Sequence, residues 1–213
     1  MTARGVDRRL LLCAALAWLA AAPLAHAAVS SPKAAPDDMA MGSPKARVTV
    51  IEYASAACPH CARFNNNVFP AFKKKYVDTG KVRYVYREFL TDPVEVAAAG
   101  ALLARCAGKD KYFSVLDGFF RGQAHAYETG DIRGLIMSVG KKAGLTETRI
   151  NACLTDEAAS KSLNERVQRF SDDGVDSTPT FVINGQKLAD LDHEVALADL
   201  DAAIGPLLER KRR

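Results

Sequence analysis

Two cysteines separated by two residues are the feature of this 213-residue sequence that points most directly to chemistry. They lie in Cys58-Pro59-His60-Cys61, between the apolar run 48–53 and a segment, 62–76, whose apolar residues have helical spacing. A cysteine pair at the turn from a strand to a helix is typical of thiol–disulfide exchange. We therefore expect these two sulfurs to alternate between a dithiol and a disulfide.

The position of the motif predicts different roles for the two thiols. A helix N-terminus presents unpaired backbone N–H groups and the positive end of a dipole, so the pKa of Cys58 should be lowered there. His60 would add to this effect when it is protonated or donates a hydrogen bond. Cys61 lies one turn further along and should be the more buried partner. We expect Cys58, the exposed sulfur, to exchange with substrate and Cys61 to resolve the mixed disulfide.

Two other interpretations of the motif are weaker. Half a zinc site would need a second such motif or a histidine pair at ligand spacing, whereas His125 and His193 are isolated in the sequence. A purely structural disulfide has no need of a helix N-terminus. We therefore expect no metal and no cofactor other than the redox-active Cys58–Cys61 disulfide.

Glu52 interrupts the apolar strand six residues before Cys58. A buried acid costs free energy unless it has a partner or a proton. The carboxyl is therefore either a proton relay to Cys61 beneath the cysteine turn or an outward-facing strand residue, and the residues alone leave both open. Thr178-Pro179 precedes a β-type run, where a proline is common and a cis bond is the minority state.

The first 27 residues are typical of an export signal. A positive N-terminal region precedes the apolar stretch 10–24, and Ala25-His26-Ala27 fits a cleavage site. The apolar stretch is too short for a retained membrane span. Cleavage would leave four of the five cysteines, which fits an oxidising compartment such as the periplasm. The net charge of +4 without a basic stripe argues against nucleic-acid binding.

The rest of the chain alternates between strand and helix patterns around a long helical region. Residues 28–45 are rich in Ala, Ser and Pro and are expected to form a flexible lead-in. Pro70 should kink the helix that follows the cysteines. Helices are expected from Pro93 to about Phe170, and a last amphipathic helix ends near Leu208. Strand patterns and a hairpin turn occupy 47–53, 81–89, 180–183 and Asn184-Gly185.

Two stretches together resemble the DsbA family of exported thiol–disulfide oxidoreductases: VIEYASAACPHC at 50–61 and GVDSTPTFVING at 174–185. The resemblance in element order extends over about 42–208. It implies an α/β thioredoxin fold, formed by 46–90 and 172–213, with an all-helical domain inserted at 91–171.

The resemblance also implies roles for site residues. Pro179 would be a cis-proline that faces the cysteine pair and, with Thr178, binds substrate backbone. Glu52 would be the buried acid of the family, and the dipeptide Pro59-His60 matches its strongly oxidising members. Thr178 replaces the valine of the best-known oxidase and also occurs in isomerase-type relatives, so the balance between these activities stays open.

Cys106 and Cys153 fall in the expected helical insertion. Some members of the family carry a second disulfide in this region, and an oxidising compartment favours pairing. We therefore expect a structural Cys106–Cys153 disulfide. The alternative is two buried free thiols.

These observations predict an exported dithiol oxidase that donates its disulfide to reduced or unfolded exported proteins. The family resemblance implies reoxidation by a quinone-linked membrane partner. The surface around Cys58 should be mostly apolar, and the short lead-in favours a monomer. The alternatives are a disulfide isomerase or reductase of the same fold and a non-catalytic, chaperone-like binding module.

Overall fold

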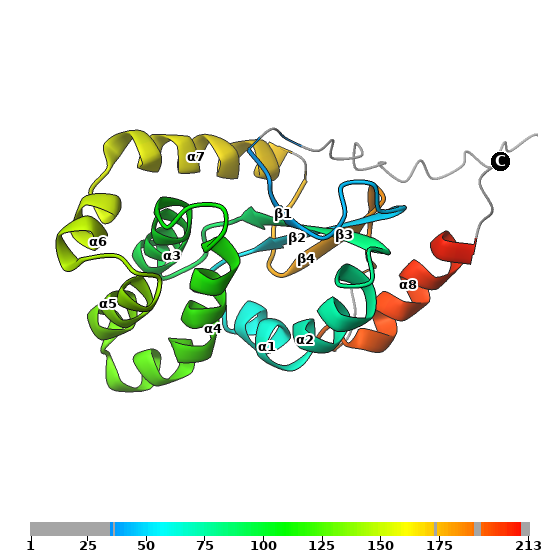
Figure 1. Cartoon of the computed structure of the whole chain (residues 1–213), viewed down its shortest axis with the longest axis horizontal. Helices are drawn as coiled ribbons and strands as arrows, with labels where there is room; N and C mark the ends of the chain where they lie inside the picture. Colours follow the sequence, from blue (N-terminus) through cyan, green and yellow to red (C-terminus); the bar gives the residue numbers. More distant parts are fainter. Residues whose placement is uncertain (1–34, 36, 173, 190–192, 210–213) are drawn as a thin grey trace, which may run out of the picture.

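A five-stranded mixed sheet forms the centre of the molecule in the computed structural model (Figure 1). The structure describes residues 35, 37–172, 174–189 and 193–209, so the expected signal peptide lies outside the described residues. The strand order is β1-β3-β2-β4-β5, and only β2 and β3 run parallel. The strands are β1 (Met39–Met41), β2 (Val48–Ala54), β3 (Val82–Glu88), β4 (Thr180–Ile183) and β5 (Gln186–Lys187).

Helices cover both faces of the sheet, because its central strands are apolar on both sides. Val48 and Val50 of β2 pack in the main core, to which α1, α2 and α8 contribute, whereas Ile51 and Tyr53 pack against Phe170 of α7 on the other face. This alternation is the period of a strand. The bounds of the helices on the first face are α1 (Pro59–Asn67), α2 (Phe69–Phe72), the π-helix η1 (Lys73–Val77) and α8 (Leu197–Glu209).

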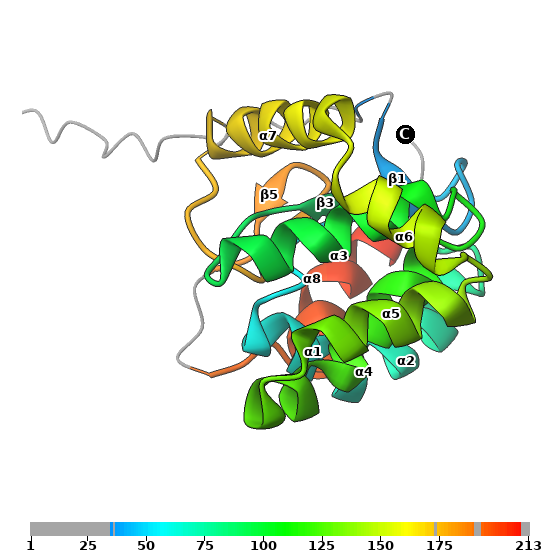
Figure 2. The ribbon, with the colours of Figure 1, turned by 90° about the vertical axis from the view of Figure 1, so that its left-hand side faces the viewer.

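The expected inserted helices form one group at an end of the sheet. Figure 2, which views the molecule from that end, shows α3 to α6 in front of the sheet, and α7 lies on the face of the sheet opposite α1. Asp131 and Thr146 cap α5 and α6 with their side chains. The thioredoxin fold with a helical insertion is confirmed. The helices are α3 (Val94–Cys106), α4 (Tyr112–Thr129), α5 (Ile132–Lys142), α6 (Glu147–Leu154) and α7 (Glu157–Asp172).

The predicted structural disulfide is present between Cys106 and Cys153. It joins the last residue of α3 to α6, with the two Cα atoms 5.9 Å apart. The alternative of two buried free thiols is therefore excluded. Within the described part of the chain, no helix is both long and apolar enough to cross a membrane.

The prediction of a flexible lead-in is wrong for its second half. Residues 39–41 form β1, which pairs antiparallel with β3 at the edge of the sheet. Asp38 accepts two hydrogen bonds of 2.9 Å from Arg87, and both side chains are almost fully buried. A strand of three residues has too short a pattern to be recognised, because backbone pairing with a distant strand holds it in place.

Pro70 has the effect predicted for it. The segment after the cysteines is not one helix: α1 ends with the Val68 N–H donating to Phe64 O, and a new turn begins at Phe69. Pro70 occupies the first turn of α2, where its missing N–H costs nothing. The break turns the aromatic side chains of α2 toward the core. The first helix starts at Pro59, three residues earlier than predicted, which places the cysteine pair on it.

Candidate active site

Cys58 caps the N-terminus of α1, and Cys61 lies one turn inside the helix. Cys58 has extended backbone angles, and Pro59 opens the helix after it. Both cysteines are free thiols in this structure. Cys61 is fully buried, as predicted, but Cys58 is itself only 6% exposed. Cys58 is therefore the more exposed of the two cysteines, as predicted, but the neighbouring residues cover most of its surface.

The environment of the pair lowers the pKa of Cys58 to about 5. The largest cause is a hydrogen bond from the Cys61 thiol to the Cys58 sulfur, and Thr178 and the backbone N–H groups of Cys61 and His60 add to it against the opposing effect of burial. The pKa of Cys61 is raised well above its ordinary value, chiefly by burial and then by Cys58. The Cys61 thiol and the N–H groups of the first helical turn therefore stabilise the Cys58 thiolate, and burial keeps Cys61 protonated.

Reduced protein should show a thiolate absorbance that rises with a midpoint near pH 5, instead of the ordinary thiol value of about 8.5. Because the pKa is lower in the folded than in the unfolded chain, the reduced form should gain stability as the pH rises from about 5 toward 9. Ultraviolet absorbance against pH measures the midpoint. Reduced Cys58→Ser is the control and should show no thiolate in that range, because Cys61 remains protonated.

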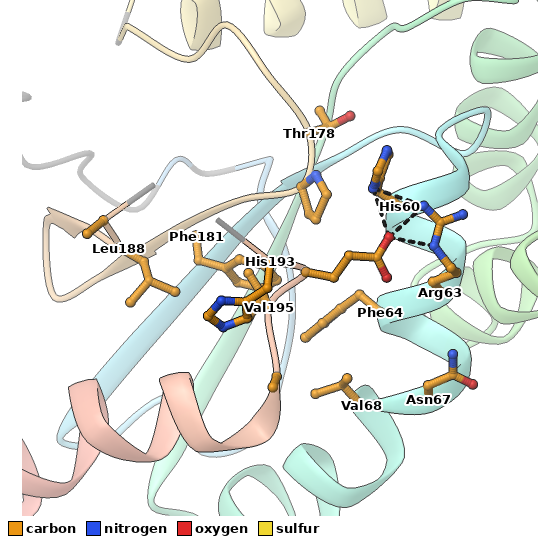
Figure 3. Close-up of a pocket in the computed structure, with 14 residues that line it drawn as sticks. His60, Arg63, Phe64, Asn67, Val68, Thr178, Phe181, Leu188, His193 and Val195 are labelled. Carbon is orange, nitrogen blue, oxygen red and sulfur yellow. Dashed lines mark hydrogen bonds and ion pairs between the residues drawn. The ribbon is translucent and has the colours of Figure 1, made fainter. Parts of the chain in front are cut away.

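The imidazole of His60 does not stabilise the Cys58 sulfur as predicted. It is 60% exposed, and its Nδ1 lies 3.0 Å from Glu194 Oε1 and 3.0 Å from an Arg63 nitrogen (Figure 3). Arg63 also donates to Glu194 through Nε at 2.6 Å. The ring turns away because this carboxylate, on the loop before α8, offers it a charged partner. The contribution of His60 to the lowered pKa of Cys58 comes from its backbone N–H.

The loop before β4 brings Thr178-Pro179 against the cysteine pair. The peptide bond is cis, and the Thr178 carbonyl oxygen lies 3.4 Å from Cys58 Sγ. The bond between Asp92 and Pro93, at the start of the helical insertion, is also cis, and no sequence pattern indicated it. Two motifs that are 120 positions apart in the sequence therefore meet at one sulfur.

Glu52 is buried beneath the cysteine turn, so the interpretation as an outward-facing residue is wrong. Its side chain accepts a short hydrogen bond from Tyr84 Oη, and the residue is 2% exposed. Burial raises the pKa of Glu52 to about 8 against the lowering effect of the Tyr84 hydrogen bond. The carboxyl interacts electrostatically with both Cys58 and Cys61. It therefore holds a proton at neutral pH, close to the buried thiol.

Replacing Glu52 with Gln should stabilise the oxidised protein increasingly as the pH rises. In the unfolded chain the carboxyl ionises near pH 4.5, but in the folded chain only near 8, so the native state loses stability between these values. We expect Glu52→Gln to be more stable than the wild type by about 4 kcal/mol at pH 8 and by little at pH 4.5. Urea unfolding over this pH range measures the difference, and a difference that is independent of pH would contradict the burial argument.

Side chains of α4 hold the loop that carries the motif, a role that no pattern in the sequence indicated. Gln123 Nε2 donates to the carbonyl oxygen of Ala56 at 2.7 Å, and Tyr127 Oη donates to that of Ala57 at 2.8 Å. Gly100 of α3 packs so closely that a Cβ there would lie 2.3 Å from Ala56 Cβ. The helical insertion thus fixes the backbone just before Cys58. The sequence indicates only that α4 is a helix. Helical periodicity does not predict which distant group a polar side chain will contact.

A groove of about 630 Å³ opens beside the cysteine turn, between α1 and the segments on either side of β5 (Figure 3). We call it the side groove. Apolar side chains form its walls, and the His60–Glu194–Arg63 cluster stands at its lip. The expectation of an apolar surface near Cys58 therefore holds for the walls but not for the lip. The wall residues include Phe64, Val68, Phe181, Leu188 and Val195.

Comparison with known proteins agrees with this geometry. The family model described as thioredoxin matches residues 34–205. The chain belongs to the thioredoxin family. The crystal structure of Wolbachia pipientis alpha-DsbA1 is similar to it, with a TM-score of 0.72 and 28% identity over 82% of this chain and 92% of that one. The predicted membership of the DsbA group within the thioredoxin family is therefore confirmed.

Relatives of this thioredoxin-family chain in Rickettsia are named as protein-disulfide oxidoreductases. The Rickettsia bellii protein is 30% identical over 170 residues, which cover 79% of this chain and 65% of the relative. The Rickettsia typhi protein is 34% identical over 156 residues, 70% of this chain and 55% of the relative. This chain therefore spans about 55 to 65% of the length of these relatives. Bacillus subtilis BdbD, at 20% identity and a TM-score of 0.66, shares the fold.

Proposed function

We propose that this chain is an exported thiol–disulfide oxidoreductase that donates the Cys58–Cys61 disulfide to reduced proteins. The observation that carries the proposal is the asymmetric pair at the start of α1, with a lowered pKa at Cys58 and a raised one at Cys61. A stabilised Cys58 thiolate favours the reduced form, which makes the disulfide a stronger oxidant. The redox group is the cysteine pair itself.

The reaction that we propose has two exchange steps. A substrate thiolate attacks Cys58 Sγ, the Cys58–Cys61 bond breaks, and the Cys61 sulfur leaves with the electron pair and takes a proton. A second substrate thiolate then attacks the substrate sulfur of the mixed disulfide. A substrate disulfide forms, and Cys58 leaves as a thiolate. The substrate loses two electrons and the cysteine pair gains them.

Glu52 supplies the proton for the Cys61 sulfur in this proposal. Its pKa of about 8 means that the acid is protonated near neutral pH, and it interacts electrostatically with Cys61. A pKa close to the working pH is what a group that both gives and regains a proton needs. Thr178 and Pro179 would align the substrate backbone, because their loop lies against Cys58 Sγ.

The relatives' names support an oxidoreductase acting on proteins, and we extend that to this chain. The side groove, with apolar walls, suits unfolded segments that have little sequence in common. We propose an extracytoplasmic location, a monomeric enzyme and a membrane-bound, quinone-linked reoxidant. The first of these agrees with the Cys106–Cys153 disulfide, since such bonds persist in oxidising compartments.

A second candidate function, disulfide isomerase, is favoured by Thr178. This residue replaces the valine of the best-known DsbA-type oxidase, and its carbonyl oxygen lies 3.4 Å from the exchanging sulfur. A structure named as a protein-disulfide isomerase, from Novosphingobium aromaticivorans, has the same fold, with a TM-score of 0.69. A different residue at position 178 would change the stability of the mixed disulfide between Cys58 and substrate, and with it the rate of substrate release.

The reduction potential of the Cys58–Cys61 pair against glutathione tests the proposal. A value near about −120 mV, typical of DsbA-type oxidants, would support an oxidase, whereas one near the thioredoxin value of about −270 mV would contradict it. Two activity assays separate the candidates: oxidation of a reduced peptide and reactivation of scrambled ribonuclease. An isomerase would be efficient in the second, and an oxidase only in the first.

A further inference from the structure

A second cavity, of about 330 Å³, lies on the opposite side of α1 from the side groove. It is bounded by α1, α2, β3 and α4, and it shares no lining residue with the side groove. Five aromatic and three other apolar side chains line it, together with five polar or charged residues and the carboxyl of Glu52, which lies at its inner end. We call it the tyrosine cavity. Its aromatic lining residues are Phe69, Tyr84, Tyr86, Phe113 and Phe120.

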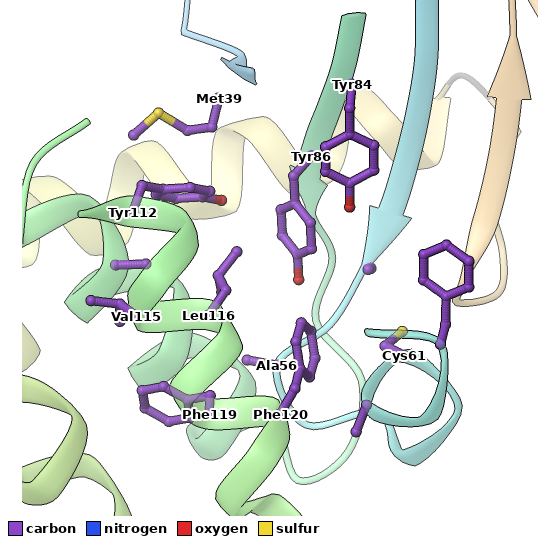
Figure 4. Packing of buried hydrophobic residues seen from close by; sticks show 14 of the residues in the cluster. Met39, Ala56, Cys61, Tyr84, Tyr86, Tyr112, Val115, Leu116, Phe119 and Phe120 are labelled. Carbon is purple, nitrogen blue, oxygen red and sulfur yellow. The ribbon is translucent and has the colours of Figure 1, made fainter. Parts of the chain in front are cut away.

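The hydroxyl of Tyr86 is the feature of this cavity that calls for a ligand. Tyr86 is 3% exposed, and the described part of the chain offers its hydroxyl no hydrogen-bond partner. Figure 4 shows Tyr84 and Tyr86 pointing the same way from β3, with the Tyr86 hydroxyl directed toward Phe120. Tyr84 donates to Glu52, so only Tyr86 has its donor free. A ligand oxygen that accepts this hydrogen in place of solvent would gain a net hydrogen bond of about 0.5–1.5 kcal/mol.

The charges around the tyrosine cavity determine what kind of molecule fits it. Glu52 keeps its proton at neutral pH because burial raises its pKa to about 8, so the inner end is neutral. At the rim, Arg121 pairs with Asp117 at 2.7 Å and Lys73 with Asp78 at 2.5 Å. The charged side chains at the rim are already paired, so a charged ligand would gain no new ion pair there. It would also lose its hydration among the aromatic rings, which costs free energy. The cavity is therefore suited to a neutral molecule.

We propose that the tyrosine cavity binds a small neutral ring compound with one hydroxyl group, of the phenol class. The ring would pack among Phe69, Phe113 and Phe120, and its oxygen would accept the free Tyr86 hydroxyl hydrogen and donate toward the Glu52 carboxyl. A volume of this size, with largely apolar walls and a few polar groups, is typical of small-molecule sites.

Such a ligand would be coupled to the thiols. The hydrogen bond that the ligand donates would favour the ionised form of Glu52, as the Tyr84 hydrogen bond does, and Glu52 interacts electrostatically with Cys58 and Cys61. By linkage, the oxidised protein, which has no Cys58 thiolate, would then bind the ligand more tightly than the reduced protein at pH 8. Regulation of the enzyme by such a ligand rests on the proposed function. Binding of the ligand in the tyrosine cavity does not.

Fluorine NMR titrations of the full oxidised protein at pH 7 test the site, with 4-fluorophenol and fluorobenzene as the probes. We expect saturable binding of 4-fluorophenol that is at least about fivefold tighter than that of fluorobenzene, the ratio that one net hydrogen bond of about 1 kcal/mol gives. Tyr86→Phe should remove this preference and leave fluorobenzene binding unchanged. A lack of saturable binding, or an equal preference in Tyr86→Phe, would overturn the proposal.

Two further variants keep the test sharp. Tyr76→Phe is the matched control: its hydroxyl donates to Asp201 at 2.6 Å, outside the tyrosine cavity, and its loss should leave both titrations unchanged. Leu116→Phe adds volume from the wall and should abolish binding of both probes. If Tyr86→Phe fails to fold, Leu116→Phe decides: binding that persists in this variant places the probe elsewhere and overturns the proposal.

Discussion

Cys58→Ser is expected to lower disulfide exchange by about a thousandfold or more, to the background rate, because it removes the sulfur that forms the covalent bond. Cys61→Ser should instead stop after the first step. The lowered pKa of Cys58 keeps it as a reactive thiolate at neutral pH, whereas Cys61 is fully buried and protonated. The two variants therefore differ in what they accumulate as well as in their loss of turnover.

Oxidised glutathione measures this difference. Reduced Cys61→Ser should gain one glutathionyl group at Cys58 and keep it, because no second thiol is present to displace it. Reduced Cys58→Ser should gain none. Mass spectrometry of the intact protein after acid quenching reads both results. An adduct on Cys61 in the Cys58→Ser variant would reverse the assignment of the attacking and resolving thiols, and rapid turnover in either variant would disprove the mechanism.

Glu88→Ala is expected to cost about 3–5 kcal/mol of the free energy of unfolding. The Glu88 side chain is 2% exposed at the end of β3 and accepts hydrogen bonds from Arg105 of α3 and from Tyr112 of α4, the latter at 2.8 Å. Arg166 of α7 lies 3.4 Å away, and its Nε has no hydrogen-bond partner. Removing the carboxylate would leave two largely buried guanidinium groups without the counter-charge that contacts them directly.

Glu147→Ala is the matched control for this loss. Glu147 also faces two cations, Arg133 at 3.2 Å and Lys141 at 3.9 Å, but its side chain is 53% exposed. Solvent screens such pairs, so we expect a change below about 1 kcal/mol. Urea unfolding of both variants makes the comparison. Equal losses would show that Glu88 does not hold the helical insertion to the sheet.

The buried ion cluster at Glu88 shows why some contacts of this protein could not be predicted from the sequence. Its members come from β3, α3, α4 and α7, and each is an ordinary charged or aromatic residue in its own segment. The same holds for Asp38 and Arg87, which are almost fully buried together where a flexible lead-in was expected. A pairing between distant segments leaves no periodic trace, because neither partner indicates which residue will lie opposite it.

The side chains beneath the motif needed the tertiary structure for a different reason. The sequence placed Glu52 in an apolar strand but left its direction open, and it did not identify Tyr84 as its partner. Direction on a strand follows from which face packs against which helix, and that depends on α1 and α2 covering this face. The turn of His60 toward Glu194 likewise depends on a loop more than 130 positions away.

What the sequence determined by itself is local. Cys58 and Cys61 differ because a helix N-terminus is built from consecutive residues, so spacing alone makes one sulfur a cap and the other a buried partner. Pro70 broke the helix for the same kind of reason. Only the tertiary structure decided how Thr178, Gln123 and Tyr127 meet the cysteine turn, because those contacts join segments 65 to 120 positions apart. They depend on packing that no single segment specifies.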